Sequence, residues 1–159
     1  MSKPKWMDIA AGEIGQKEIP GPAANPRIVA YDACTSLKAT SDEVPWCAAF
    51  VCWCLEQAGI GSTRSAMASS YLNWGMQCEP RPGCIVVIRH EGLDAATGSL
   101  TGNHVAFLVS IDSAHINLLG GNQHDSVKIS SFPLAAYEVR AFRWPEGYDS
   151  NGDPVVDNS

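Results

Sequence analysis

Pro45-Trp46-Cys47-Ala48-Ala49-Phe50-Val51 is the stretch that decides how this chain folds and what it can do. A proline is favoured in the first turn of a helix, because its missing N–H would have no partner there anyway. The pattern predicts a helix over residues 45–58 that ends at Gly59. Cys47 would then lie among free backbone N–H groups at the positive end of the helix dipole, which favours a nucleophilic thiolate. We therefore expect Cys47 to be catalytic.

The other five of the six cysteines are expected to be reduced, packed thiols. The chain is too long and too apolar for disulfides to be its main support. An alternative is a structural metal site that uses Cys52 and Cys54 together with histidines. A one-residue gap within a helix points two side chains about 200° apart, which argues against it. We expect no metal and no cofactor.

The order of the predicted elements indicates the α+β class. Apolar spacing predicts helices first, and alternating β-branched residues predict strands from residue 84 onward. The glycine pair Gly120-Gly121 is expected to end the third strand. The arrangement predicts N-terminal helices packed on a mostly antiparallel sheet of about five strands. The expected helices cover residues 5–17, 27–34 and 66–75, and the expected strands cover residues 84–89, 105–111, 115–119, 127–130 and 138–144.

Charge and hydropathy exclude several classes of protein. The net charge of −6, without a basic patch, argues against binding to nucleic acid or to anionic membranes. No apolar run is long enough to span a membrane, and no apolar region follows the N-terminal lysines, so we expect neither a membrane anchor nor a signal peptide. We expect one catalytic domain over residues 1–145, a loose polar tail over residues 146–159, and a monomer.

A thiol nucleophile needs a base, and the base needs a group that fixes its tautomer. Of the four histidines, His104 is distinguished by its place at the start of an apolar strand, where it can face a helix N-terminus. Asn122 follows the glycine pair and can return beside His104 in an antiparallel hairpin. Its side-chain carbonyl can accept a hydrogen bond from the imidazole, and Gln123 is the alternative for this role.

Four blocks of sequence resemble the CHAP branch of the NlpC/P60 cysteine peptidases. They are residues 42–51, 81–87, 102–107 and 119–123, and they occur in the same order as in that family. Residues 16–22 resemble the phage- and prophage-associated subgroup. The chain departs from the family pattern at Cys84, where an aspartate is common.

The resemblance implies a papain-like α+β fold and hydrolysis of amide bonds in bacterial peptidoglycan. It also implies that Cys47 is the nucleophile, that His104 is the base and that Asn122 orients the imidazole. Some relatives bind calcium through closely spaced aspartates, but the acidic residues before Cys47 are too scattered to support such a site. The expected substrate contacts are Trp46, Glu43, Gln123 and Trp74, with core packing as the alternative for the tryptophans and a solvated or capping role for Glu43.

Two reactions fit this resemblance, namely that of an N-acetylmuramoyl-L-alanine amidase and that of a peptide endopeptidase. The expected setting is a phage endolysin for a thin-walled Gram-negative host. It would accumulate in the host cytoplasm and act on the cell wall in the periplasm after release by a holin. The alternatives are a secreted interbacterial amidase effector and a catalytically inactive wall-binding domain of the same fold.

Overall fold

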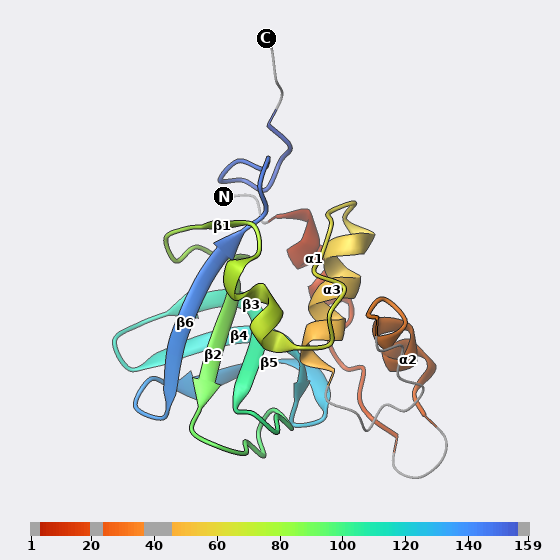
Figure 1. The fold of residues 1–159 in the computed structure, drawn as a ribbon, viewed down its shortest axis with the longest axis vertical. Coiled ribbons are helices and arrows are strands. Elements are labelled where there is room, and N and C mark those ends of the chain that lie inside the picture. Colours follow the sequence, from red (N-terminus) through yellow and green to blue (C-terminus); the bar gives the residue numbers. More distant parts are fainter. Residues whose placement is uncertain (1–3, 20–23, 37–45, 156–159) are drawn as a thin grey trace.

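In the computed structural model, the described residues form three α-helices, which lie to one side of a six-stranded antiparallel sheet (Figure 1). The structure describes residues 4–19, 24–36 and 46–155. The α+β class is as predicted, and the strand order is β1-β6-β2-β3-β4-β5. The helices are α1 (Lys5–Gly12), α2 (Pro26–Asp32), α3 (Cys47–Gln57) and the 3-10 helix η1 (Ala68–Asn73). The strands are β1 (Met76–Gln77), β2 (Ile85–His90), β3 (Asn103–Ile111), β4 (His115–Gln123), β5 (Ser126–Pro133) and β6 (Tyr137–Trp144).

Helix α3 is the central helix, and almost all of its residues are buried. A helix that is apolar on every side must be covered on every side, and α3 packs on β3 and β4 as well as on α1 and α2. The helix begins at Cys47 with Trp46 as its N-cap, two residues later than predicted. Gly59 follows its C-terminal end with a φ of 80°, in the left-handed conformation expected of a C-terminal glycine.

Four parts of the secondary structure differ from the prediction. The helix expected over residues 66–75 is the shorter 3-10 helix η1 (Ala68–Asn73). Helix α1 ends at Gly12 instead of reaching residue 17, since Gly15 adopts a φ of 105°. The short strand β1 has an exposed pair of residues and no sequence pattern that could have predicted it. Strand β4 continues through the glycine pair, because Gly120 still pairs with Lys128 of β5 before the register shifts.

The glycine pair allows α3 to approach the sheet closely. A Cβ atom on Gly121 would lie 2.7 Å from both Phe50 Cβ and Trp46 Cζ3, which is closer than packed carbon atoms tolerate. A Cβ atom on Gly120 would collide with the side-chain oxygen of Gln123. The first turn of α3 therefore lies directly against the end of β4.

The segment after β6 folds back beside α1, in place of the loose tail expected for this region. The indole N–H of Trp144 donates to the Asp149 carbonyl at 2.9 Å, and Tyr148 forms a bridge with Pro154. The ring of Tyr148 also meets Trp6 edge to face, with 6.1 Å between ring centroids. The part of this segment that the structure describes is residues 146–155, which lie near the top of Figure 1. No helix in the described ranges combines the length and apolar character needed to cross a bilayer.

Replacing Gly121 with alanine should destabilise the fold, because the new methyl group must displace Trp46 or Phe50. We expect the free energy of unfolding to fall by about 1–3 kcal/mol, which urea denaturation monitored by circular dichroism would measure. Gly12→Ala is the matched control, since a Cβ atom on Gly12 meets nothing within 4 Å. An equal loss of stability in both variants would contradict the close approach of α3 to β4.

Candidate active site

Cys47, the first residue of α3, lies at a narrow cleft of about 180 Å³. Its side chain is almost covered, with 7% of its surface exposed. One wall of the cleft is the segment that leads into η1, and the other is the loop between β2 and β3. The residues that line the cleft with Cys47 are Ala66, Met67, Ala68, Ser69, Thr97, Ser99, Leu100, Thr101 and Asn103.

Burial and backbone hydrogen bonding act in opposite directions on the Cys47 thiol. Burial raises its pKa, whereas hydrogen bonds from the backbone N–H groups of Val105, Ala48 and Cys47 itself lower it. The effect of burial is larger, so the pKa is above its ordinary value. Desolvation of the charge thus opposes the thiolate that the helix N-terminus was expected to favour.

Helix α3 packs on β3, the strand that carries His104, and the Val105 N–H of that strand acts to lower the pKa of the Cys47 thiol. Backbone N–H groups along a strand alternate between its two neighbours, and Leu108 donates toward β2, to the carbonyl of Cys84. Val105 therefore faces the β4 side. There the pairing of β3 with β4 extends only to Phe107 and Leu119, which leaves the Val105 N–H available to the sulfur.

His104 is fully buried on β3, and its Nε2 atom lies 3.0 Å from Oε1 of Gln123. Burial lowers its pKa to about 4, although the hydrogen bond that the ring donates to Gln123 and the charge of Asp94 both act to raise it. Nδ1 of the same ring is buried and makes no hydrogen bond within the described part of the chain. At neutral pH the ring is therefore an uncharged imidazole with one unpaired nitrogen.

The side-chain amide of Gln123 is held in a single orientation. Its Nε2 group donates to the carbonyls of Leu118 at 3.1 Å and Lys128 at 2.8 Å, so Oε1 must face His104. Because an amide oxygen only accepts hydrogen bonds, the proton of the neutral imidazole must be on Nε2. Nδ1 of His104 is then the basic nitrogen, which is free to accept a proton.

Asn122, which we expected to orient His104, does not make that contact. Extending the register of Phe107 with Leu119 would place Asn122 opposite His104. However, Asn122 adopts a φ of 58°, and the β4–β5 register shifts between Gly120 and Gln123. This turn of the strand brings Gln123 to the imidazole, while the buried Oδ1 of Asn122 has no hydrogen-bond partner in the described residues.

Neither of the two tryptophans expected to contact substrate lines the cleft. Trp46 is fully buried and donates from its indole to Glu18 at 2.7 Å, so its expected stacking on substrate is wrong and the core-packing alternative holds. Trp74 is half-buried and lies in a separate groove with Tyr148. Glu43 lies outside the described residues.

Sequence reasoning missed the two walls of the cleft. Met67 and Leu100 are large apolar residues with 63% and 73% of their surface exposed, one on each wall. Leu100 is one of two leucines, with Leu93, in a polar, glycine-containing loop, and this is a signal that could have identified it. Within the described ranges, no three histidine, cysteine, aspartate or glutamate side chains form a cluster suited to a metal ion.

The buried neutral His104 should make stability depend on pH. Its pKa is about 4 in the folded protein against 6.5 for the exposed group, so the unfolded chain binds more protons between these values. Stability should therefore fall as the pH drops from about 6.5 to 4, by about 3 kcal/mol. His104→Gln should remove this part of the pH dependence in urea titrations at pH 7, 5 and 4. Cys47→Ala should retain this pH dependence. If stability of His104→Gln still fell between pH 6.5 and 4 as in the native protein, the burial of a neutral His104 would be contradicted.

Comparison with known proteins gives one family. A model of the CHAP domain matches residues 39–122, which is more than half of the chain and spans Cys47, His104 and Asn122. No curated protein matches the chain. CHAP domains are typically cysteine hydrolases of peptidoglycan, so the match supports this general class of activity. The chain belongs to the CHAP domain family.

Proposed function

We propose that this protein cleaves an amide bond of peptidoglycan with Cys47 as nucleophile, His104 as base and Gln123 as the group that orients the base. The observation that carries the proposal is the hydrogen bond between Gln123 and His104, which leaves Nδ1 of the imidazole unprotonated beside the strand that contacts the Cys47 sulfur. These three residues supply the nucleophile, the base and the orienting group that covalent catalysis needs.

The proposed reaction has two stages. His104 Nδ1 takes the thiol proton as the Cys47 sulfur bonds to the amide carbonyl carbon, and the carbonyl oxygen becomes an oxyanion. The free N–H groups of the first turn of α3 can stabilise this charge, at about 3–4 kcal/mol for a well-placed donor. The C–N bond then breaks as Nδ1 returns the proton to the leaving amine. Water, deprotonated by the same nitrogen, hydrolyses the thioester and restores the thiol.

The lining of the cleft fits a small uncharged substrate group. All the cleft residues that the structure describes are uncharged, and most of them are alanine, serine or threonine. Asn103 also contributes a buried Oδ1 atom without a partner among these residues, which can accept a hydrogen bond from a peptide N–H of the substrate. Two bonds offer a small uncharged group with a peptide N–H. One is the bond cut by an N-acetylmuramoyl-L-alanine amidase, and the other is a peptide bond next to alanine in the stem.

For the biological setting, we propose a phage endolysin that reaches the cell wall of a Gram-negative host after a holin opens the inner membrane. The support is the resemblance of residues 16–22 to the phage-associated subgroup. The alternative setting is an interbacterial effector. Lysis of expressing cells only after the inner membrane is permeabilised supports the endolysin, whereas killing of neighbouring cells in mixed culture supports the effector.

Cys47→Ala should reduce the release of muropeptides from purified sacculi by about 10⁴-fold or more, because the nucleophile is lost. Mass spectrometry of the products identifies the bond, since free stem peptides indicate an amidase and opened cross-links an endopeptidase. The matched control is Cys34→Ser, a half-buried thiol outside the cleft, which should retain activity. Full activity in Cys47→Ala would refute the mechanism.

A pair of neighbouring substitutions tests which residue orients His104. Gln123→Leu removes the acceptor from Nε2 of the imidazole and should lower kcat by about 100-fold. Asn122→Gly removes a side chain at a φ of 58°, which glycine adopts without strain, and should change kcat much less. Circular dichroism shows whether each variant is folded. The reverse order of the two effects would assign the orienting role to Asn122.

A further inference from the structure

The loop between β2 and β3, here called the wall loop (residues 91–102), is organised around the buried carboxylate of Asp94. This residue has 7% of its surface exposed. Its Oδ1 atom accepts from the Ala96 N–H at 3.1 Å, and its Oδ2 atom accepts from the hydroxyls of Thr97 and Tyr137, both at 2.9 Å. Three donors from two parts of the fold therefore hold one buried charge.

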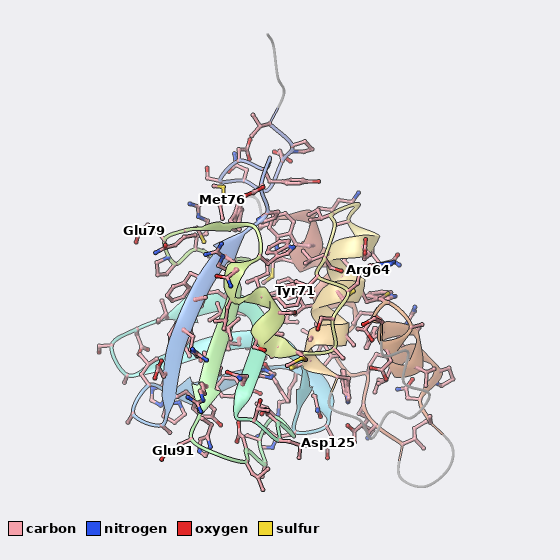
Figure 2. The ribbon with its side chains drawn as sticks, in the orientation of Figure 1. Arg64, Tyr71, Met76, Glu79, Glu91 and Asp125 are labelled. Atoms are coloured by element: carbon pink, nitrogen blue, oxygen red, sulfur yellow. The ribbon has the colours of Figure 1, made fainter. Side chains whose placement is uncertain are left out.

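The same residue shapes the wall of the cleft. The backbone N–H of Asp94 donates to the Ser99 carbonyl at 3.1 Å, which closes the loop on itself. Ala96 accepts from the His124 N–H at 2.8 Å and so joins the loop to the turn between β4 and β5. Figure 2 shows Glu91, at the start of the wall loop, and Asp125, in that turn, at the same end of the molecule. The loop is thus fastened where β3 begins and β4 ends.

Two ring contacts lead from the base of the proposed reaction towards Asp94. The His104 ring lies 5.7 Å from the ring of Phe132, which lies 5.0 Å from the ring of Tyr137, the hydroxyl donor to Asp94. The negative charge of Asp94 favours the protonated form of His104, and it is the one charged group in the described part of the chain found to do so. The other neighbours of the ring are uncharged. Gln123 contributes an amide oxygen, and Phe132 contributes an aromatic ring whose centroid is 5.7 Å away. A proton that moves from Cys47 to His104 therefore creates a buried cation for which Asp94 supplies the opposite charge.

We propose that Asp94 is a positioning residue of the active site, which stabilises the imidazolium form of His104 during catalysis and fixes the wall loop against the cleft. The claim that Asp94 acts during catalysis rests on the proposed function. The electrostatic effect on His104 concerns the folded protein alone and does not need a substrate.

The decisive variant is Asp94→Asn, which removes the charge and keeps the shape. The asparagine oxygen can still accept from Ala96, and the hydroxyls of Thr97 and Tyr137 can rotate to accept from the new NH₂ group. Thr97→Val removes one hydrogen bond to Asp94 and leaves its charge. Asp112→Asn is the matched surface control, since Asp112 accepts two backbone hydrogen bonds, each of 2.8 Å, in an exposed turn between β3 and β4.

The first measurement is an NMR titration of the His104 ring in each folded variant. Asp94→Asn should lower the pKa of His104, because the imidazolium loses a nearby opposite charge. Thr97→Val and Asp112→Asn should leave it as in the native protein. If Asp94→Asn does not fold, Asp94→Ser removes the same charge with a smaller side chain. An unchanged titration after loss of the charge, or an equal shift in Thr97→Val, would overturn the inference.

The second measurement is the pH dependence of kcat and KM on a soluble muropeptide. Asp94→Asn should lower kcat by about tenfold with little change in KM, and should move the acidic limb of the profile to lower pH. A purely structural role would lower activity without moving that limb, and would contradict the inference. If the native protein cleaves no peptidoglycan while the titration shift is present, the proposed function fails and the electrostatic role of Asp94 stands.

Discussion

The close packing of the first turn of α3 on the end of β4 is the constraint on which the site depends. Gly121 has no side chain, and the rings of Trp46 and Phe50 occupy the space that a Cβ atom would fill. This approach brings Cys47 to the strand that carries His104. Gly120 leaves room in the same way for the side chain of Gln123, which turns back across it to reach the imidazole. Two adjacent glycines thus leave the room that the start of α3 and the side chain of Gln123 occupy.

Burial determines the protonation states that result from this packing. Both the Cys47 thiol and the His104 imidazole are removed from water, so each is disfavoured in its charged form. The orienting group Gln123 is a neutral amide, which fixes the tautomer without the strong stabilisation of imidazolium that a carboxylate in contact would give. In the proposed mechanism a proton moves within this buried neutral pair, and the charge of Asp94 stabilises the cation that forms.

The sequence was sufficient for the class of fold, for helix α3 and for the apolar strands, because their burial patterns are strong. It also singled out Cys47 and His104 as candidates. The strand prediction was wrong at Gly120-Gly121, because glycines that usually interrupt a strand here allow the helix to pack closely on the sheet. Sequence reasoning also failed at Asn122, because the positive φ that gives Gln123 the contact with His104 depends on tertiary packing. The cleft walls at Met67 and Leu100 come from loops, which have no periodic pattern to read.

The most direct test of the account is the tautomer of the His104 ring, measured by ¹⁵N NMR of the folded protein at neutral pH. The hydrogen bonds of Gln123 predict a neutral ring with its proton on Nε2 and a bare Nδ1 atom, ready to take the proton of Cys47. A neutral ring protonated on Nδ1 would carry its basic nitrogen at Nε2, which faces Gln123, so Nδ1 could not take the thiol proton. Such a result would contradict the assignment of His104 as the base that Gln123 orients.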